Sequence, residues 1–426
     1  MPDHTISPLF DNALARLRGH SPFLATLAER EGELLGGLSR ALEDPLRAAR
    51  SFGGEMGEGR RLRIERRRLA LLVAIGDLAG VFDLTRVTGL LTEFADDALD
   101  RAIRTAILER TPDAEPRGFA AIALGKQGSG ELNYSSDIDP ILIFDPEILP
   151  CRPREAPEDA AVRVGRRVIE LLQARDGDGY VMRVDLRLRP SPEVTPIALP
   201  VEAAISYYES QALPWERAAF IRARACAGDL ALGEGFLAAI RPFVWRRALD
   251  YGTIREIRDI SRRIRDHHSK GQVFAPGYDL KRGRGGIREI EFFAQIHQLI
   301  HGGRDPALRA PATRDALAAL AEAGRIDAGE AEALASAYTL FRTIEHRLQM
   351  VDDRQTHTLP ANAEALDNVA ALHGLESGAA LIELLRPHVE RVGRIYDSLA
   401  GDEEPRLPSD ADTLAVRLAE AGFADV

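Results

Sequence analysis

One ordered run, GFAAIALGKQGSGELNYSSDIDPILIFD at residues 118–145, constrains the fold of this chain more than any other feature. Its two apolar ends, GFAAIALG and PILIFD, predict short buried strands. Between them lie a glycine-rich loop with Gly128 and Ser129, and an acidic pair, Asp137 and Asp139. In an extended chain these two carboxylates point to the same side. Because adjacent buried carboxylates repel each other, the pair predicts a site for divalent cations.

The glycine-rich loop predicts a phosphate contact. Glycine lets backbone N–H groups close around phosphate oxygens, so we expect Gly128 and Ser129 to bind nucleotide or phosphate, with Ser136 beside them. Lys126 joins this set because it is one of only three lysines among 55 basic residues, and it lies inside the loop. Alone, such a loop or an Asp-x-Asp pair is common and structural. Their order between two apolar strands favours a catalytic site.

A third acid is expected further along the chain, in the run VMRVDLRLR at residues 181–189. Strict alternation predicts a strand with one apolar face and one polar face. Asp185 lies on the polar face among three arginines, so we expect it to complete a metal site while Arg187 and Arg189 contact phosphate. The alternative is an ordinary solvent-exposed edge strand.

The rest of the chain predicts helices around this centre. The expected organisation is an N-terminal helical region at 1–112, a nucleotide-handling α/β domain at 113–235 and a helical bundle at 236–400. Residues 401–426 read as a linker and the start of a missing domain. The predicted fold class is α+β, mostly helical, with a small mixed sheet. The basic run at 60–68 favours a solvated helix face over a patch that binds an anion or a partner.

Composition excludes several classes of protein. The formal charge of -11 argues against a nucleic-acid partner, because phosphate backbones favour positive surfaces. Two cysteines, Cys151 and Cys226, are too few for a disulfide framework, which suits a reducing compartment. The sequence lacks an N-terminal signal-peptide pattern and any run of 18 apolar residues. We therefore expect a cytoplasmic protein with no membrane partner.

Three other features have competing interpretations. His297 and His301 are four residues apart, which superficially suggests a metal site, but a structural role is favoured. The glycine-rich loop from Lys281 to Glu291 could reach nucleotide phosphate or could simply turn the chain and cap a helix. The segment from Trp215 to Arg224 predicts a helix that supports the sheet, and the further interpretation is that one of its arginines contacts phosphate.

Longer motifs carry a resemblance. A glycine-serine loop, an Asp-x-Asp pair and a later aspartate are typical of the polymerase-β-like nucleotidyltransferase superfamily. The strings GKQGSGELNYSSDID, RVDLRLRP and YYESQALPWERAAFIRARACAGD resemble the glutamine synthetase adenylyltransferase family more closely. The later blocks KRGRGGIREIEFFAQIHQLIHGGRDP and RTIEHRLQMVDDRQTHTLP resemble the helical domain that follows in that family. Together the resemblance covers about residues 60 to 400. One departure is Pro140, where the family usually has leucine.

The resemblance implies a function. That family carries two nucleotidyltransferase modules, one transferring and one removing AMP, and this chain resembles the N-terminal, adenylyl-removing half. It implies that phosphate attacks AMP-tyrosine on glutamine synthetase to give ADP, in the regulation of nitrogen assimilation. Asp137, Asp139 and Asp185 would bind Mg²⁺ or Mn²⁺, and a PII-type signalling protein would regulate the activity. The alternatives are adenylylation from ATP and a non-catalytic partner-binding module.

Overall fold

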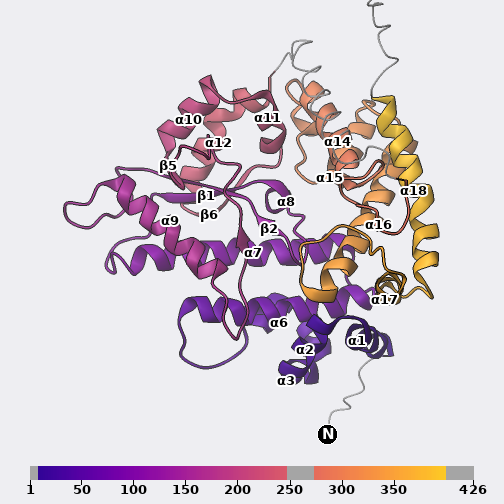
Figure 1. Cartoon of the computed structure of the whole chain (residues 1–426). Coiled ribbons are helices and arrows are strands. Elements are labelled where there is room, and N and C mark those ends of the chain that lie inside the picture. Colours follow the sequence, from indigo (N-terminus) through magenta and orange to yellow (C-terminus); the bar gives the residue numbers. More distant parts are fainter. Residues whose placement is uncertain (1–7, 247–272, 400–426) are drawn as a thin grey trace, which may run out of the picture.

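The computed structural model describes residues 8–246 and 273–399, and a four-stranded mixed sheet lies near the middle of the molecule (Figure 1). In spatial order its strands are β5 (Ala198–Pro200), β3 (Pro140–Phe144), β1 (Phe119–Ala123) and β6 (Arg224–Gly228). Strand β1 is antiparallel to both β3 and β6, whereas β3 and β5 are parallel. A separate parallel pair is formed by β2 (Asp137–Ile138) and β4 (Arg183–Val184). The predicted buried strands at 119–123 and 140–144 are confirmed.

Helices cover both faces of the sheet. One face packs against α7 (Leu84–Leu108) and α9 (Pro157–Gln173), and the other packs against α10 (Val201–Ser210) and α12 (Leu230–Val244). Alternate residues of the central strands therefore enter two different cores, as the twofold periodicity of a strand requires. All five residues of β1 are buried for this reason, which explains its continuous apolar sequence.

From residue 8 onward, six helices precede α7 and share one continuous core with the α7 face of the sheet. They are α1 (Pro8–His20), α2 (Pro22–Arg30), α3 (Gly32–Gly36), α4 (Leu38–Glu43), α5 (Pro45–Arg50) and α6 (Glu58–Leu78). The basic run at 60–68 lies on α6, and its prediction as a solvated face is wrong. Arg66 pairs with Asp353 at 2.8 Å, and Arg67 pairs with Glu31 at 2.7 Å. These arginines join α6 to neighbouring segments.

The C-terminal helices form a second core beside the sheet domain (Figure 1). They are α14 (Ile287–His301), the 3₁₀ turn η1 (Pro306–Leu308), α15 (Thr313–Glu322), α16 (Ala328–Asp352), α17 (Ala363–His373) and α18 (Gly378–Ser398). Helix α16 contacts α2 and α7, and α17 contacts α1, so the C-terminal helices pack against the N-terminal ones. The predicted segment at 401–426 lies outside the described residues.

Two sequence predictions need correction. The alternating run at 181–189 forms only a two-residue strand, β4, and residues 187–190 form turns and bends. Its apolar side chains also separate, because Val184 packs against the α7-side core and Leu188 packs against the α12-side core. The predicted helix at 215–224 is shorter, since α11 spans Pro214–Phe220 and Arg224 begins β6.

Within residues 8–246 and 273–399, none of the helices is both long enough and apolar enough to cross a membrane. The expectation of a chain that is mostly helical with a small mixed sheet is confirmed.

Candidate active site

The parallel pair β2–β4 brings the three predicted acids together. Asp137 lies opposite Arg183 in this pair, and Ile138 lies opposite Val184. The pairing continues beyond the strands, since the Asp185 amide donates to the Ile138 carbonyl at 2.9 Å. Asp139 and Asp185 therefore follow two adjacent parallel strands at the same end. Acids that are far apart in the sequence meet because the register of two short strands aligns them.

Asp139 is the electrostatic centre of the three acids. Burial, followed by the charges of Asp185 and Asp137, raises the pKa of Asp139 to about 7. The positive charges of Lys281 and Arg187 act in the opposite direction. No donor forms a hydrogen bond with the Asp139 carboxylate among the described residues. A partly buried carboxylate beside two others, with no donor of its own, is an environment that a cation would stabilise.

Arginines hold the other two acids. The Arg183 Nε donates to Asp137 Oδ1 at 2.6 Å, and the Arg187 Nε donates to Asp185 Oδ2 at 2.8 Å. Hydrogen bonding from Arg187 lowers the pKa of Asp185 below its usual value. Arg183 was not predicted as a site residue, although it lies on the same polar face of the sequence as Asp185. The sequence feature that could have identified Arg183 is its position two residues before Asp185.

The acids suit a divalent cation chemically, although they are not arranged around one. No group of three or more His, Cys, Asp or Glu side chains within residues 8–246 and 273–399 is placed to hold a metal ion. Two of the acids are turned toward guanidinium groups instead, and the 85% exposed Arg187 side chain has room to move away. Carboxylate oxygens are the ligands that Mg²⁺ and Mn²⁺ prefer. Asp139 with Asp137 and Asp185 therefore forms the candidate metal site.

Glycine is required where the loop meets the acids. The loop forms a one-turn helix, α8 (Gly125–Gly128), and Gly125 has a φ of 56°. A Cβ atom at Gly125 would lie 2.6 Å from Asp139 Oδ2. The absence of a side chain thus allows the Asp139 carboxylate to lie directly against the start of α8.

The N–H groups of Gly128 and Ser129 form hydrogen bonds with backbone carbonyls within this turn. The Gly128 amide donates to the Leu124 carbonyl at 2.9 Å, and the Ser129 amide donates to the Gly125 carbonyl at 3.3 Å. The predicted role of these two amides as a phosphate cradle therefore needs correction. A Cβ at Gly128 would lie 2.1 Å from the Arg222 carbonyl oxygen, so this glycine allows α8 to pack on the chain entering β6.

We predict that Gly128→Val destabilises the protein by about 3 kcal/mol or more, because the new side chain would overlap the backbone of Arg222. Urea unfolding followed by circular dichroism measures this effect. Gly177→Ala is the matched control, since a Cβ there meets no atom within 4 Å, and its effect should stay within about 0.5 kcal/mol. Equal stability of the Gly128→Val protein and the wild type would contradict the packing role.

The remaining predicted residues differ in their surroundings. The Lys126 ammonium pairs with Glu345 Oε2 on α16 at 2.9 Å, and burial lowers the pKa of Lys126 to about 7. The Ser136 hydroxyl accepts from the Asn133 amide at 3.1 Å. Arg189 donates to the carbonyls of Leu186, Pro192, Thr195 and Pro196, which shapes the loop after β4. Of the predicted phosphate ligands, only Arg187 presents an exposed guanidinium beside the acids.

Helix α16 braces the loop that carries Asp137. The Gln349 side chain accepts from the Ser135 amide at 2.9 Å, and the Ser135 hydroxyl donates to the Asp353 carbonyl at 3.0 Å. Earlier on the same helix, the fully buried Arg342 donates to the Glu131 carbonyl at 2.6 Å. These contacts were not predicted from the sequence. The available signal was a stripe of polar residues at helical spacing on an otherwise apolar helix, formed by Arg342, Glu345, His346 and Gln349.

The loop between Lys281 and Glu291 mostly turns the chain. The Glu289 carboxylate accepts from the Gly285 amide at 2.7 Å, which joins the loop to the first turn of α14. Arg284 pairs with Asp397 on α18 at 2.6 Å. Lys281 differs, because its charge acts on both Asp139 and Lys126. Lys281 therefore lies near enough to the acids for its charge to act on them, whereas Arg284 and Glu289 stabilise the fold.

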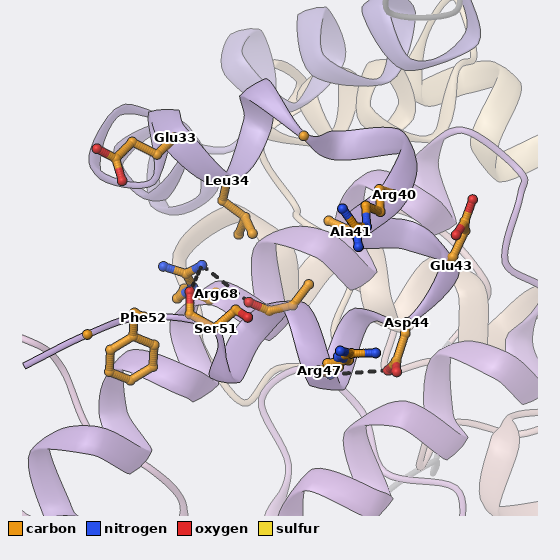
Figure 2. Close-up of a pocket in the computed structure, with 13 residues that line it drawn as sticks. Glu33, Leu34, Arg40, Ala41, Glu43, Asp44, Arg47, Ser51, Phe52 and Arg68 are labelled. Atoms are coloured by element: carbon orange, nitrogen blue, oxygen red, sulfur yellow. Dashed lines mark hydrogen bonds between the residues drawn. The ribbon is translucent and has the colours of Figure 1, made fainter.

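A large cavity lies elsewhere, on the N-terminal helices. It has a volume of about 730 Å³ and is lined by twelve of the residues between Glu33 and Gly53 together with Arg68 (Figure 2). Its lining mixes acids such as Glu33 and Glu43 with Arg40 and Arg47, and Arg68 donates to the Ser51 carbonyl at 3.1 Å. None of the three predicted acids lines this cavity, so it is not the site of the acid cluster.

Comparisons with known proteins agree with these features. The family model of glutamate-ammonia ligase adenylyltransferase matches residues 6–239, and that of GlnD PII-uridylyltransferase matches residues 257–400. Similar relatives are the bifunctional glutamine synthetase adenylyltransferase/adenylyl-removing enzymes of Caulobacter vibrioides and Rhizobium meliloti. The first is 45% identical over 92% of this chain and 42% of its own length. The second is 44% identical over 83% of this chain and 37% of its own length. The chain thus spans about two fifths of these relatives.

Proposed function

This chain belongs to the glutamate-ammonia ligase adenylyltransferase family, and we propose that its acid cluster removes AMP from glutamine synthetase by phosphorolysis. The environment of the Asp139 carboxylate is the main support for a nucleotidyl-transfer site. This carboxylate lies beside two other acids and has no hydrogen-bond donor among the described residues. We assign the small mixed sheet and its helices to the polymerase-β-like nucleotidyltransferase fold. The names of the relatives support glutamine synthetase as the protein substrate.

In the proposed reaction, an oxygen of inorganic phosphate attacks the AMP phosphorus on an adenylylated tyrosine. The bond to the tyrosine oxygen breaks, the phenolate leaves and takes up a proton, and ADP forms. Asp137, Asp139 and Asp185 would hold Mg²⁺ or Mn²⁺, which would supply charge stabilisation for the transferring phosphoryl group and the departing oxygen. Arg187, exposed beside the acids, would then exchange Asp185 for a phosphate oxygen.

The direction of the reaction is supported by the acids themselves. Transfer of AMP from ATP to tyrosine would need a base for a phenol whose pKa is about 10. Asp185 is poorly suited to that task, because its carboxylate pairs with Arg187 in the structure and would bind a divalent cation in the proposed reaction. Phosphate is already an anion at neutral pH and needs no strong base. The resemblance to the adenylyl-removing half of the family gives the same direction.

Several further properties belong to this proposal. The adenylylated form of glutamine synthetase is the partner, phosphate and an adenine nucleotide are the small ligands, and the reaction occurs in the cytoplasm. A match to PII-uridylyltransferase over residues 257–400 supports regulation by a PII-type signalling protein.

Product analysis tests the proposal. We expect the chain to release ADP from adenylylated glutamine synthetase when phosphate and Mg²⁺ are both present, and to release little nucleotide when EDTA removes the metal. Arsenate should replace phosphate, and its adduct should decay to AMP. Release of AMP in the presence of phosphate would mean hydrolysis instead. Attachment of label from α-labelled ATP to the unmodified synthetase would assign the opposite direction to this half.

A further inference from the structure

A second cavity lies between the end of α12 and the segment after α14, and it has a volume of about 780 Å³. Eight residues from the described part of the chain line it; four of these are arginine and none is acidic, and the arginines are Arg241, Arg246, Arg304 and Arg309. In a chain of net charge -11, a cavity wall of one sign requires an explanation. The cavity of Figure 2 offers a contrast, because acids and arginines both line it.

Two arginines of this cavity differ from those of α6 in their ion pairing. Arg66 and Arg67 on α6 each pair with a carboxylate, whereas Arg241 and Arg246 form no ion pair with any described residue. Arg241 lies in the last turn of α12, where the helix dipole stabilises a positive charge. That preference explains one arginine at this position but does not explain why three more converge on the same cavity.

Arg309 is held in place before any ligand arrives. Its Nε donates to the Gly302 carbonyl at 2.7 Å, and its guanidinium lies 5.1 Å from the centre of the Trp245 ring. Trp245 in turn packs against Gly302, where a Cβ would lie 2.6 Å from the indole. Burial and the nearby charge of Arg241 lower the pKa of Arg309, and the charge of Asp305, which does not line the cavity, acts in the opposite direction. A fixed guanidinium that a second one repels is an environment that an anion would stabilise.

We propose that this cavity binds a compact multivalent anion, specifically a ligand with linked phosphate groups. Arginine forks match phosphate oxygens in pairs, and several guanidinium groups around one cavity suit a ligand that carries more than one negative charge. The volume is that of a small-molecule site. The cavity shares no residue with the acid cluster and uses other elements of the fold, so this site is separate from the proposed catalytic one.

The chain provides its own reporter for this site. It contains two tryptophans, Trp215 and Trp245, and Trp215 is 40% exposed on α11. A Trp215→Phe protein therefore reports only on Trp245, which lines the cavity. Pyrophosphate added in EDTA at constant ionic strength should change the Trp245 fluorescence in a saturable manner, with a dissociation constant below about 1 mM. EDTA prevents a metal from recruiting pyrophosphate to the acid cluster.

Paired variants complete the test. In the same background, Arg241→Gln with Arg246→Gln should weaken pyrophosphate binding by about tenfold or more. Arg18→Gln with Arg104→Gln is the matched control, because both arginines are exposed and unpaired within the described residues and lie on α1 and α7. Binding by this control should stay within about twofold of the parent, since its cavity is intact. Equal loss in both pairs would mean general charge attraction, and no saturable signal in the parent would mean no site; either result would overturn the proposal.

Discussion

Asp139→Asn is expected to reduce deadenylylation by about 10³-fold or more while making the metal-free protein more stable. The carboxylate is the proposed central metal ligand, and loss of several kcal/mol of charge stabilisation in the transition state corresponds to this factor. Its ionised form is also unfavourable in the fold, because burial and two neighbouring acids raise its pKa to about 7. Function and stability should therefore change in opposite directions.

The stability difference between Asp139→Asn and the wild type should depend on pH in a defined direction. In the unfolded chain Asp139 would titrate near its ordinary value of 3.8, whereas in the fold it titrates near 7. Between these values the folded state binds more protons, so the contribution of Asp139 to stability is greatest below pH 4 and is lost as the pH rises toward 7. The asparagine side chain of the variant does not titrate. The free energy of unfolding of the variant should thus exceed that of the wild type by an amount that grows from pH 4 to pH 7. Above pH 7 this difference should reach about 2–4 kcal/mol.

Urea unfolding in EDTA from pH 4 to pH 8 measures this difference. Asp113→Asn is the control, because Asp113 is exposed and has no partner within the described residues, and it should leave the pH slope unchanged. Addition of Mg²⁺ at pH 8 should stabilise the wild type more than the Asp139→Asn protein. Full activity in Asp139→Asn would exclude the proposed role of this acid, and a variant less stable than the wild type at pH 8 would contradict the electrostatic argument.

The central strands and the three acids were predictable because their signals are local. Strand β1 is buried on both faces, so its five apolar residues mark it directly, and Asp137 and Asp139 lie between it and β3. The run at 181–189 was overinterpreted for a physical reason. Its alternation is real, but its apolar residues enter two different cores, and Arg189 folds the end of the run onto nearby carbonyls.

The surroundings of the loop were not predictable from local patterns. Lys126 and Glu345 are 219 residues apart, and they pair only because the fold brings α16 to the loop of α8. A lysine in a glycine-rich loop therefore suggested a phosphate ligand, whereas the fold gives its ammonium a carboxylate partner. Strand β5 was missed because it has only three residues. Strand β6 was missed because its sequence, RACAG, contains only small side chains after Arg224, whose guanidinium pairs with Asp96 on α7.

Arg342→Met is expected to destabilise the protein by about 3–5 kcal/mol, the cost of removing one member of a buried charged network. The Arg342 side chain is 0% exposed and donates to the Tyr338 hydroxyl at 2.6 Å and to the Glu131 carbonyl at 2.6 Å. Its Nε also lies 3.3 Å from Glu345. Methionine fills a similar volume but leaves the Glu131 carbonyl and the Asn133 side chain without this donor.

The same substitution should affect catalysis below the melting temperature, because residues 131–136 lead directly into Asp137. Without Arg342 this loop keeps its contact with Gln349 of α16 but loses the earlier contact at Glu131. The acids should then be slightly displaced, which should lower activity by about tenfold to a hundredfold. Arg117→Met is the control, since the Arg117–Glu115 pair is exposed and should contribute less than about 0.5 kcal/mol. A stability loss in Arg342→Met without any loss of activity in the folded protein would show that α16 supports the fold but does not position the acids.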